Sequence, residues 1–134
     1  MPNTKATGVA YLDPEFSTCY ASEELGYSND AQGTVTQATS KSTAVTLNKS
    51  AGQITMNAAT LNAQTNVTFT LNNTLIGPKD VTILNVAAGA TAGSYNCWIS
   101  SKATGSCTIT VRNITAATNL SEAVVINFAI IHCT

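Results

Sequence analysis

Short runs of alternating apolar and polar residues recur along the chain from Gln32 onward. The clearest run is Val67-Thr68-Phe69-Thr70-Leu71, in which apolar side chains occupy one face and threonines the other. This period of two is typical of a half-buried β-strand. Similar runs, separated by turn-forming residues such as Gly77-Pro78, give expected strands at 35–38, 44–47, 54–56, 67–71, 81–86, 95–99, 107–111 and 123–131.

The last run, 123–131, is almost continuously apolar and rich in Val and Ile. It is too short for a buried helix, so we expect a central strand that is covered on both faces. The connections between runs are too short for crossover helices, which excludes repeated βαβ units. The pattern therefore predicts an all-β domain at 32–134: an antiparallel, jelly-roll-like β-sandwich of about eight strands.

Residues 1–31 show no such periodicity, and five of the seven acidic residues lie in this segment. We expect an extended, acidic N-terminal arm that cannot form a core of its own. Two interpretations of its charge remain, a solvated arm and an arm that docks on a partner. In the second case, its aromatic residues would pack on a neighbouring subunit or shell surface; these are Tyr11, Phe16, Tyr20 and Tyr27.

Composition supports the β assignment and narrows the partners. Charged residues make up 10% of the chain, against about 25% in typical domains. Threonine, which suits a pleated surface, occupies 22 positions. The net charge of −1 argues against nucleic acid or an anionic membrane as a partner. The chain shows neither a signal peptide nor an apolar run of ~20 residues, so we expect a protein made in the cytoplasm.

The four cysteines favour a structural role. Cys97 and Cys107 would face each other if 101–104 formed the loop of a hairpin, and they would then be either a disulfide or two small buried thiols. The only histidine, His132, lies beside Cys133. Ligands that close together cannot build a tetrahedral metal site alone, so no metal is expected.

Catalytic and cofactor motifs are not evident. His132 has no recognisable nucleophile partner, carboxylates are scarce in the body of the chain, and neither phosphate-binding glycine motif occurs. We therefore expect a protein that is not an enzyme and needs no cofactor. The triplet Asn113-Ile114-Thr115 and several others match glycosylation sequons, which we interpret as chance matches in a chain rich in Asn and Thr.

Two stretches resemble a module of tailed-bacteriophage structural proteins. The first is GTVTQATSKSTAVTLNK at 33–49, followed by GQITMNAA at 52–59, and the second is 111–129. With the strands between them, the resemblance covers about residues 32–134. It implies a head decoration (cement) protein on the capsid surface of the virion, trimeric and bound to the major capsid protein. The family offers no catalytic residues to carry over.

An alternative within the same resemblance is a receptor-binding or tip domain of a phage fibre. Such a domain should present a pocket for carbohydrate, to which only Tyr95 and Trp98 could contribute. Tryptophan is, however, more often part of a core, and the chain has no long shaft. Decoration of the capsid is therefore the favoured function.

Overall fold

The computed structural model describes residues 17–133 and contains eight β-strands and one turn of 3-10 helix, at Asn29–Ala31. The strands are β1 (Gln32–Thr36), β2 (Val45–Thr46), β3 (Ala51–Thr55), β4 (Asn66–Asn72), β5 (Val81–Ala88), β6 (Tyr95–Ala103), β7 (Ser106–Asn113) and β8 (Val125–Ile131). Each expected strand is confirmed, with ends that shift by a few residues. The all-β class therefore follows directly from the alternating pattern.

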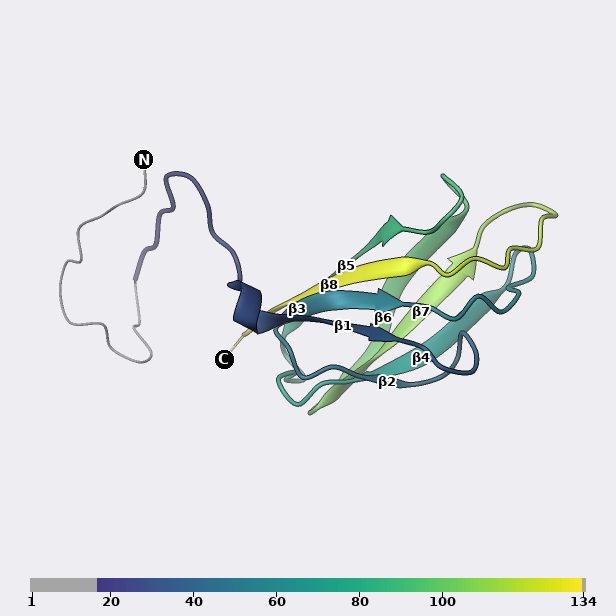
Figure 1. The fold of residues 1–134 in the computed structure, drawn as a ribbon. Coiled ribbons are helices and arrows are strands. Elements are labelled where there is room, and N and C mark those ends of the chain that lie inside the picture. Colours follow the sequence, from purple (N-terminus) through teal and green to yellow (C-terminus); the bar gives the residue numbers. More distant parts are fainter. Residues whose placement is uncertain (1–16, 134) are drawn as a thin grey trace.

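The strands form two four-stranded sheets that pack face to face in a sandwich-like arrangement (Figure 1). Sheet A has the order β1-β3-β8-β5, and sheet B has the order β2-β4-β7-β6. The two central strands are β3 and β8 in sheet A, and β4 and β7 in sheet B.

Both sheets are mixed, so the expectation of a purely antiparallel sandwich was wrong. β1 pairs with β3 in parallel, and β2 pairs with β4 in parallel, while the remaining pairs are antiparallel. Parallel neighbours need a crossover connection. Here the chain alternates between sheets over its first four strands, so β2 lies within the crossover from β1 to β3, and β3 within that from β2 to β4. A strand of the opposite sheet thus takes the place of the crossover helix.

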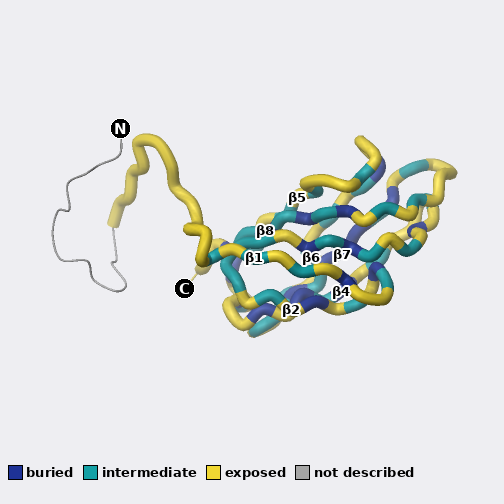
Figure 2. The backbone as a smooth tube through the Cα atoms, viewed as in Figure 1, coloured by how far each residue is buried: buried dark blue, intermediate teal, exposed yellow. Residues whose placement is uncertain are grey.

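The core lies between the two sheets and contains side chains from both. Ile54 and Ile126 of sheet A pack with Leu71, Ile109 and Val111 of sheet B, and all five are fully buried. Figure 2 shows the resulting alternation of buried and exposed positions along the strands. Burying one such aliphatic side chain contributes roughly 1.5–3 kcal/mol, so this cluster dominates the stability of the fold.

A pair of glycines lets the chain pack closely where β1 meets β3. Gly33 and Gly52 are direct partners in the parallel ladder. A Cβ added to Gly52 would lie 2.5 Å from the carbonyl oxygen of Gly33 and 2.9 Å from a methyl group of Leu47. Leu47 and Phe128 pack against this side-chain-free strip. Only glycine fits at position 52, because any side chain would collide with backbone.

β8 is central, as expected, but the prediction that it is covered on both faces was wrong. Ile126, Phe128 and Ile130 are buried in the core, whereas Ile131 is half exposed and Asn127 lies on the outer face. The strand therefore alternates like its neighbours. Its apolar outer positions, with those of β5, leave hydrophobic surface on the outside of sheet A.

Residues 17–28 contain no strand or helix and extend away from the sandwich (Figures 1 and 2). Tyr20 and Leu25 are 92% and 87% exposed. The segment meets the sandwich at Tyr27, whose hydroxyl donates a hydrogen bond to the carbonyl of Ile130 on β8. This contact places Tyr27, but not the rest of the segment, against sheet A.

Candidate interaction surfaces

An apolar patch lies on the outer face of sheet A. Val81 and Ile131 face each other across β5 and β8, and Ile83 faces Ala129 one step along. Val81, Ile83 and Ile131 are each about half exposed. We call these four residues the sheet A patch. Exposed aliphatic residues that adjoin one another indicate a surface that another molecule covers more often than scattered single residues do.

A polar row crosses sheet A next to this patch. Thr34, Gln53, Asn127 and Asn85 lie in register across all four strands. The Oδ1 atom of Asn127 is buried and accepts no hydrogen bond within residues 17–133. An unsatisfied buried amide oxygen is costly, typically by about 1–3 kcal/mol, so Asn127 is the weak point of this polar row.

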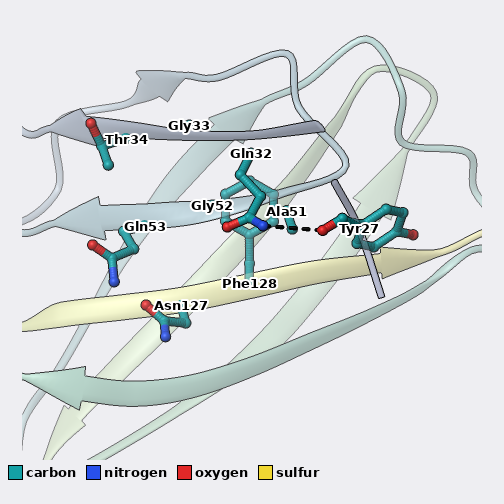
Figure 3. A pocket seen from close by; sticks show the side chains of 9 residues that line it. All are labelled: Tyr27, Gln32, Gly33, Thr34, Ala51, Gly52, Gln53, Asn127 and Phe128. Carbon is teal, nitrogen blue, oxygen red and sulfur yellow. Dashed lines mark hydrogen bonds between the residues drawn. The ribbon is translucent and has the colours of Figure 1, made fainter. Parts of the chain in front are cut away.

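A shallow hollow of about 600 Å³ lies between Tyr27 and strands β1, β3 and β8 (Figure 3). Gln32 donates a hydrogen bond of 3.2 Å from its side-chain amide to the carbonyl of Tyr27. Together with the Tyr27 hydroxyl bond to Ile130, this contact orients the incoming chain at the rim of the hollow. Sheet A therefore offers an apolar patch, a polar row and an ordered aromatic residue side by side.

Of the four aromatic residues expected at an interface, Tyr11 and Phe16 lie outside the described residues. Tyr20 is almost fully exposed, and Tyr27 is 39% exposed while its hydroxyl is bound to β8. The structure thus brings one of them, Tyr27, onto the sandwich. The sheet A patch itself was missed by the sequence analysis, because the run 123–131 was interpreted as covered on both faces and the outer face of the run 81–86 was not considered.

The outer face of sheet B has the opposite chemistry. Apart from Trp98 and Ala103, the side chains that alternate outward from β4, β6 and β7 are hydroxyl, amide or guanidinium groups. Thr68 and Thr110 form a 2.8 Å hydrogen bond across β4 and β7, and Thr110 donates a 3.0 Å bond to Ser100. The hydroxyls are therefore ordered by one another.

Trp98 stands on this face and does not belong to the core, so the expectation that favoured a core position was wrong. It lies opposite Thr110 and is 37% exposed. Its neighbours Cys97 and Ile99 instead point inward and pack against the core cluster. The alternation Asn96-Cys97-Trp98-Ile99 already contains this information, since Trp98 shares its face with polar Asn96.

Cys97 and Cys107 do not form the disulfide that was considered. The hairpin of β6 and β7 exists, but its register places Cys97 opposite Val111 and Cys107 opposite Lys102. The thiols are thus offset by about four residues, or roughly 13 Å along the strands, well beyond disulfide reach. Burial raises the pKa of Cys97, and it raises the pKa of Cys107 to about 11 despite the opposing charge of Lys102. Both thiols therefore stay protonated and unreactive.

His132 is held by Asp80. The carboxylate of Asp80 accepts hydrogen bonds from the backbone N–H groups of Gly77 (2.7 Å) and Cys133 (3.0 Å), and His132 Nδ1 lies 2.9 Å from it. These donors, the Gly77 N–H first, lower the pKa of Asp80. The cluster fastens residues 132–133 to the turn before β5, next to the sheet A patch.

A second polar cluster surrounds Lys41, a buried lysine in the connection between β1 and β2. Its Nζ donates hydrogen bonds of 2.7 Å and 2.6 Å to the carbonyls of Asn57 and Glu122. Burial lowers the pKa of Lys41, and the Glu122 carboxylate partly opposes this shift. Nearby, burial raises the pKa of Tyr95 to about 12, with Glu122 adding to the effect. Because Lys41 bonds to carbonyls of two loops, its role is to join them.

Within residues 17–133, no group of three or more His, Cys, Asp or Glu side chains could hold a metal ion. No helix of this part of the chain is long and apolar enough to cross a membrane. Comparisons with protein-family models, with curated proteins and with solved structures found no match. Function must therefore be argued from the surfaces themselves.

Proposed function

We propose that the chain is a structural protein of a bacteriophage virion that binds the outer surface of the capsid and stabilises it, as head decoration proteins do. The sheet A patch is the observation that carries the proposal. It lies beside Tyr27, so the exposed segment before β1 and the apolar face of sheet A can engage one partner surface together. The resemblance of residues 32–134 to phage structural modules supports the same function.

The energetics favour a weak contact that is repeated. Covering three half-exposed aliphatic side chains contributes roughly 1 kcal/mol each, and covering Tyr20 and Leu25 contributes roughly 2 kcal/mol each. The gross gain of about 7 kcal/mol is comparable to the cost of association, which is about 4–15 kcal/mol. One copy would therefore bind poorly, whereas linked copies gain avidity without new contacts. This reasoning supports an oligomer that binds repeated sites on the major capsid protein, and the resemblance implies that the oligomer is a trimer.

The test uses shells assembled from the major capsid protein without this chain. Binding of the full chain is measured by co-sedimentation, and the number of chains per oligomer by light scattering. Ile83→Asp in the sheet A patch should weaken binding at least tenfold, because a carboxylate would be buried at the contact. Ile114→Asp is the matched control, since Ile114 is also exposed but lies outside the patch.

Equal binding by the two variants would contradict attachment through sheet A. Failure of the unmodified chain to bind shells would contradict capsid decoration altogether. Immunogold labelling of virions then separates the favoured function from the alternative, a tip domain of a fibre. Gold over the head supports decoration, and gold confined to the tail or fibres supports the alternative.

A further inference from the structure

The polar face of sheet B contains one large apolar side chain, Trp98, which lies on the edge strand β6. Trp98 is the only tryptophan in the chain, and it is 37% exposed. Asn96 precedes it on the same face of β6, and Thr110 is its direct partner on β7. An indole flanked by hydrogen-bonding groups at the edge of a sheet offers both an apolar platform and a polar rim.

Arg112 lies one step along β7 from Thr110 and is held in place from the side. Its Nη2 donates a 3.1 Å hydrogen bond to the side-chain oxygen of Gln64. The Gln64 amide nitrogen in turn donates bonds of 3.0 Å and 2.7 Å to the carbonyls of Ile114 and Thr115. Gln64 is the only non-glycine residue of the described chain with a positive φ, at 58°. Gln64 occupies the left-handed position of the turn closed by the Thr65 N–H bond to the carbonyl of Asn62, so this turn fixes the side chain that holds Arg112.

The charge of Arg112 is not matched by its own domain. The four strands of sheet B contain no Asp or Glu, and no carboxylate within residues 17–133 forms an ion pair with Arg112. Its remaining N–H groups are planar, fixed donors suited to a carboxylate or to a pair of neighbouring hydroxyls. Arg112 lies between two asparagines in a row across the sheet, with Asn66 on β4 to one side and Asn96 on β6 to the other.

We propose that the outer face of sheet B binds a saccharide, with Trp98 under a sugar ring and Arg112 and Asn96 on its polar edge. A pyranose ring combines an apolar C–H face with a rim of hydroxyls, which matches the two kinds of group on this face. The unmatched Arg112 favours a sugar that carries a carboxylate, such as a hexuronate. This inference goes beyond the proposed function, because it concerns the opposite sheet and holds for either a head or a fibre location.

The experiment uses the emission of Trp98, which reports on this site alone because the chain has no other tryptophan. The full chain is titrated with a hexamer of β-1,4-linked mannuronate and, in parallel, with neutral cellohexaose. We expect a saturable change in emission with the acidic hexamer, at least about tenfold tighter than with cellohexaose, and weaker binding at higher salt.

Variants then locate the site. Arg112→Ala should weaken binding of the mannuronate hexamer by about tenfold or more, and Asn96→Ala less strongly. Trp98→Ala should abolish binding and Trp98→Phe should retain part of it. Both variants lack the fluorescent residue, so their binding is measured by calorimetry. Ile83→Ala on sheet A is the control that should leave binding unchanged, and circular dichroism confirms that each variant is folded.

Three results would overturn the proposal. The first is an emission spectrum that neither hexamer changes at about 10 mM, a concentration at which even weak sites fill. The second is binding that survives Trp98→Ala, which would place the ligand elsewhere. The third is equal affinity for both hexamers together with no effect of Arg112→Ala, which would remove the assigned role of the guanidinium.

Discussion

Replacing Asn113 by aspartate should destabilise the protein severely, in a way that depends on pH. Asn113 is fully buried at the end of β7. Its amide nitrogen donates 2.9 Å hydrogen bonds to the carbonyls of Leu61 and Thr118. Its side-chain oxygen accepts bonds from the backbone N–H and the hydroxyl of Thr115, at 3.0 Å and 2.7 Å. One amide thus joins three segments of chain.

The magnitude follows from these contacts. Asn113→Asp keeps the shape but turns the donor into an acceptor, so two bonds of about 1 kcal/mol each are lost. The new carboxyl is also buried opposite two carbonyls, which raises its pKa. Each unit of that rise costs about 1.4 kcal/mol at neutral pH. With a rise of about two units, the total is about 5 kcal/mol, or roughly 15–20 °C in Tm.

The sign of the pH dependence is distinctive. A carboxyl whose folded pKa lies above its unfolded value of about 3.9 is compatible with folding at low pH, and its penalty grows as pH rises through the folded pKa. The difference in stability between Asn113→Asp and the unmodified chain should therefore be smaller at pH 5 than at pH 7.5. Because the variant is compared with the unmodified chain at the same pH, the titration of the groups that both proteins share cancels.

The assay is thermal and urea unfolding, followed by circular dichroism and Trp98 emission. Asn66→Asp is the matched control, because it makes the same chemical change at an exposed position of β4, and it should shift Tm by no more than a few degrees. The reasoning would be refuted if both variants lost similar stability. It would also be refuted if the loss in Asn113→Asp were the same at pH 5 and pH 7.5.

Three further predictions follow from other contacts. Asp80→Asn should lower Tm at pH 7, because a carboxyl with a lowered pKa stabilises the fold while it is ionised. The difference in Tm between this variant and the unmodified chain should shrink below about pH 4. A difference in Tm that persists at pH 2 would contradict this prediction. In the native state a thiol reagent should label the two exposed cysteines within minutes but Cys97 and Cys107 only after unfolding, as measured by mass spectrometry. Gly52→Ala should cost more than about 3 kcal/mol in urea unfolding because its Cβ would strike backbone, whereas Gly26→Ala, with open space around it, should cost under about 1 kcal/mol.

The strands could be predicted from the sequence because a period of two is a local property. Val67-Thr68-Phe69-Thr70-Leu71 states which side chains face the core without reference to any other strand. Strand partners are not local. The parallel pairs β1–β3 and β2–β4 arise because the chain crosses between sheets at each of its early loops, and nothing in the alternating pattern records that path.

The Cys97–Cys107 disulfide failed for a related reason. Its geometry depends on register, and the hairpin turns at Thr104 and Gly105, with an irregularity between Ile99 and Ser101. A shift of a few residues separates the thiols completely. The role of Asn113 was equally hidden, because the triplet Asn113-Ile114-Thr115 has the form of a sequon, whereas in the structure Asn113 is buried and its side chain holds a turn through Thr115.

Of the two proposed interaction surfaces, one could have been predicted from local alternation and the other could not. Trp98 could have been placed outside the core from its alternation with Cys97 and Ile99. The sheet A patch could not, because an apolar residue at an outer position of a strand looks the same in sequence whether or not another molecule covers it. Its neighbours in space, Val81 from β5 and Ile131 from β8, are fifty residues apart in the chain.

The two outer faces of the sandwich differ in chemistry. At β5 and β8, sheet A presents aliphatic side chains that gain from being covered, and Tyr27 is docked beside them. Sheet B presents ordered hydroxyls, amides and Arg112, which lose solvation when an apolar partner covers them. A surface that binds a shell and a surface that samples solvent for saccharides need these two chemistries respectively. Since the two outer faces point in opposite directions, the proposed attachment through sheet A would leave Trp98 accessible, and the proposed saccharide binding could operate at the same time.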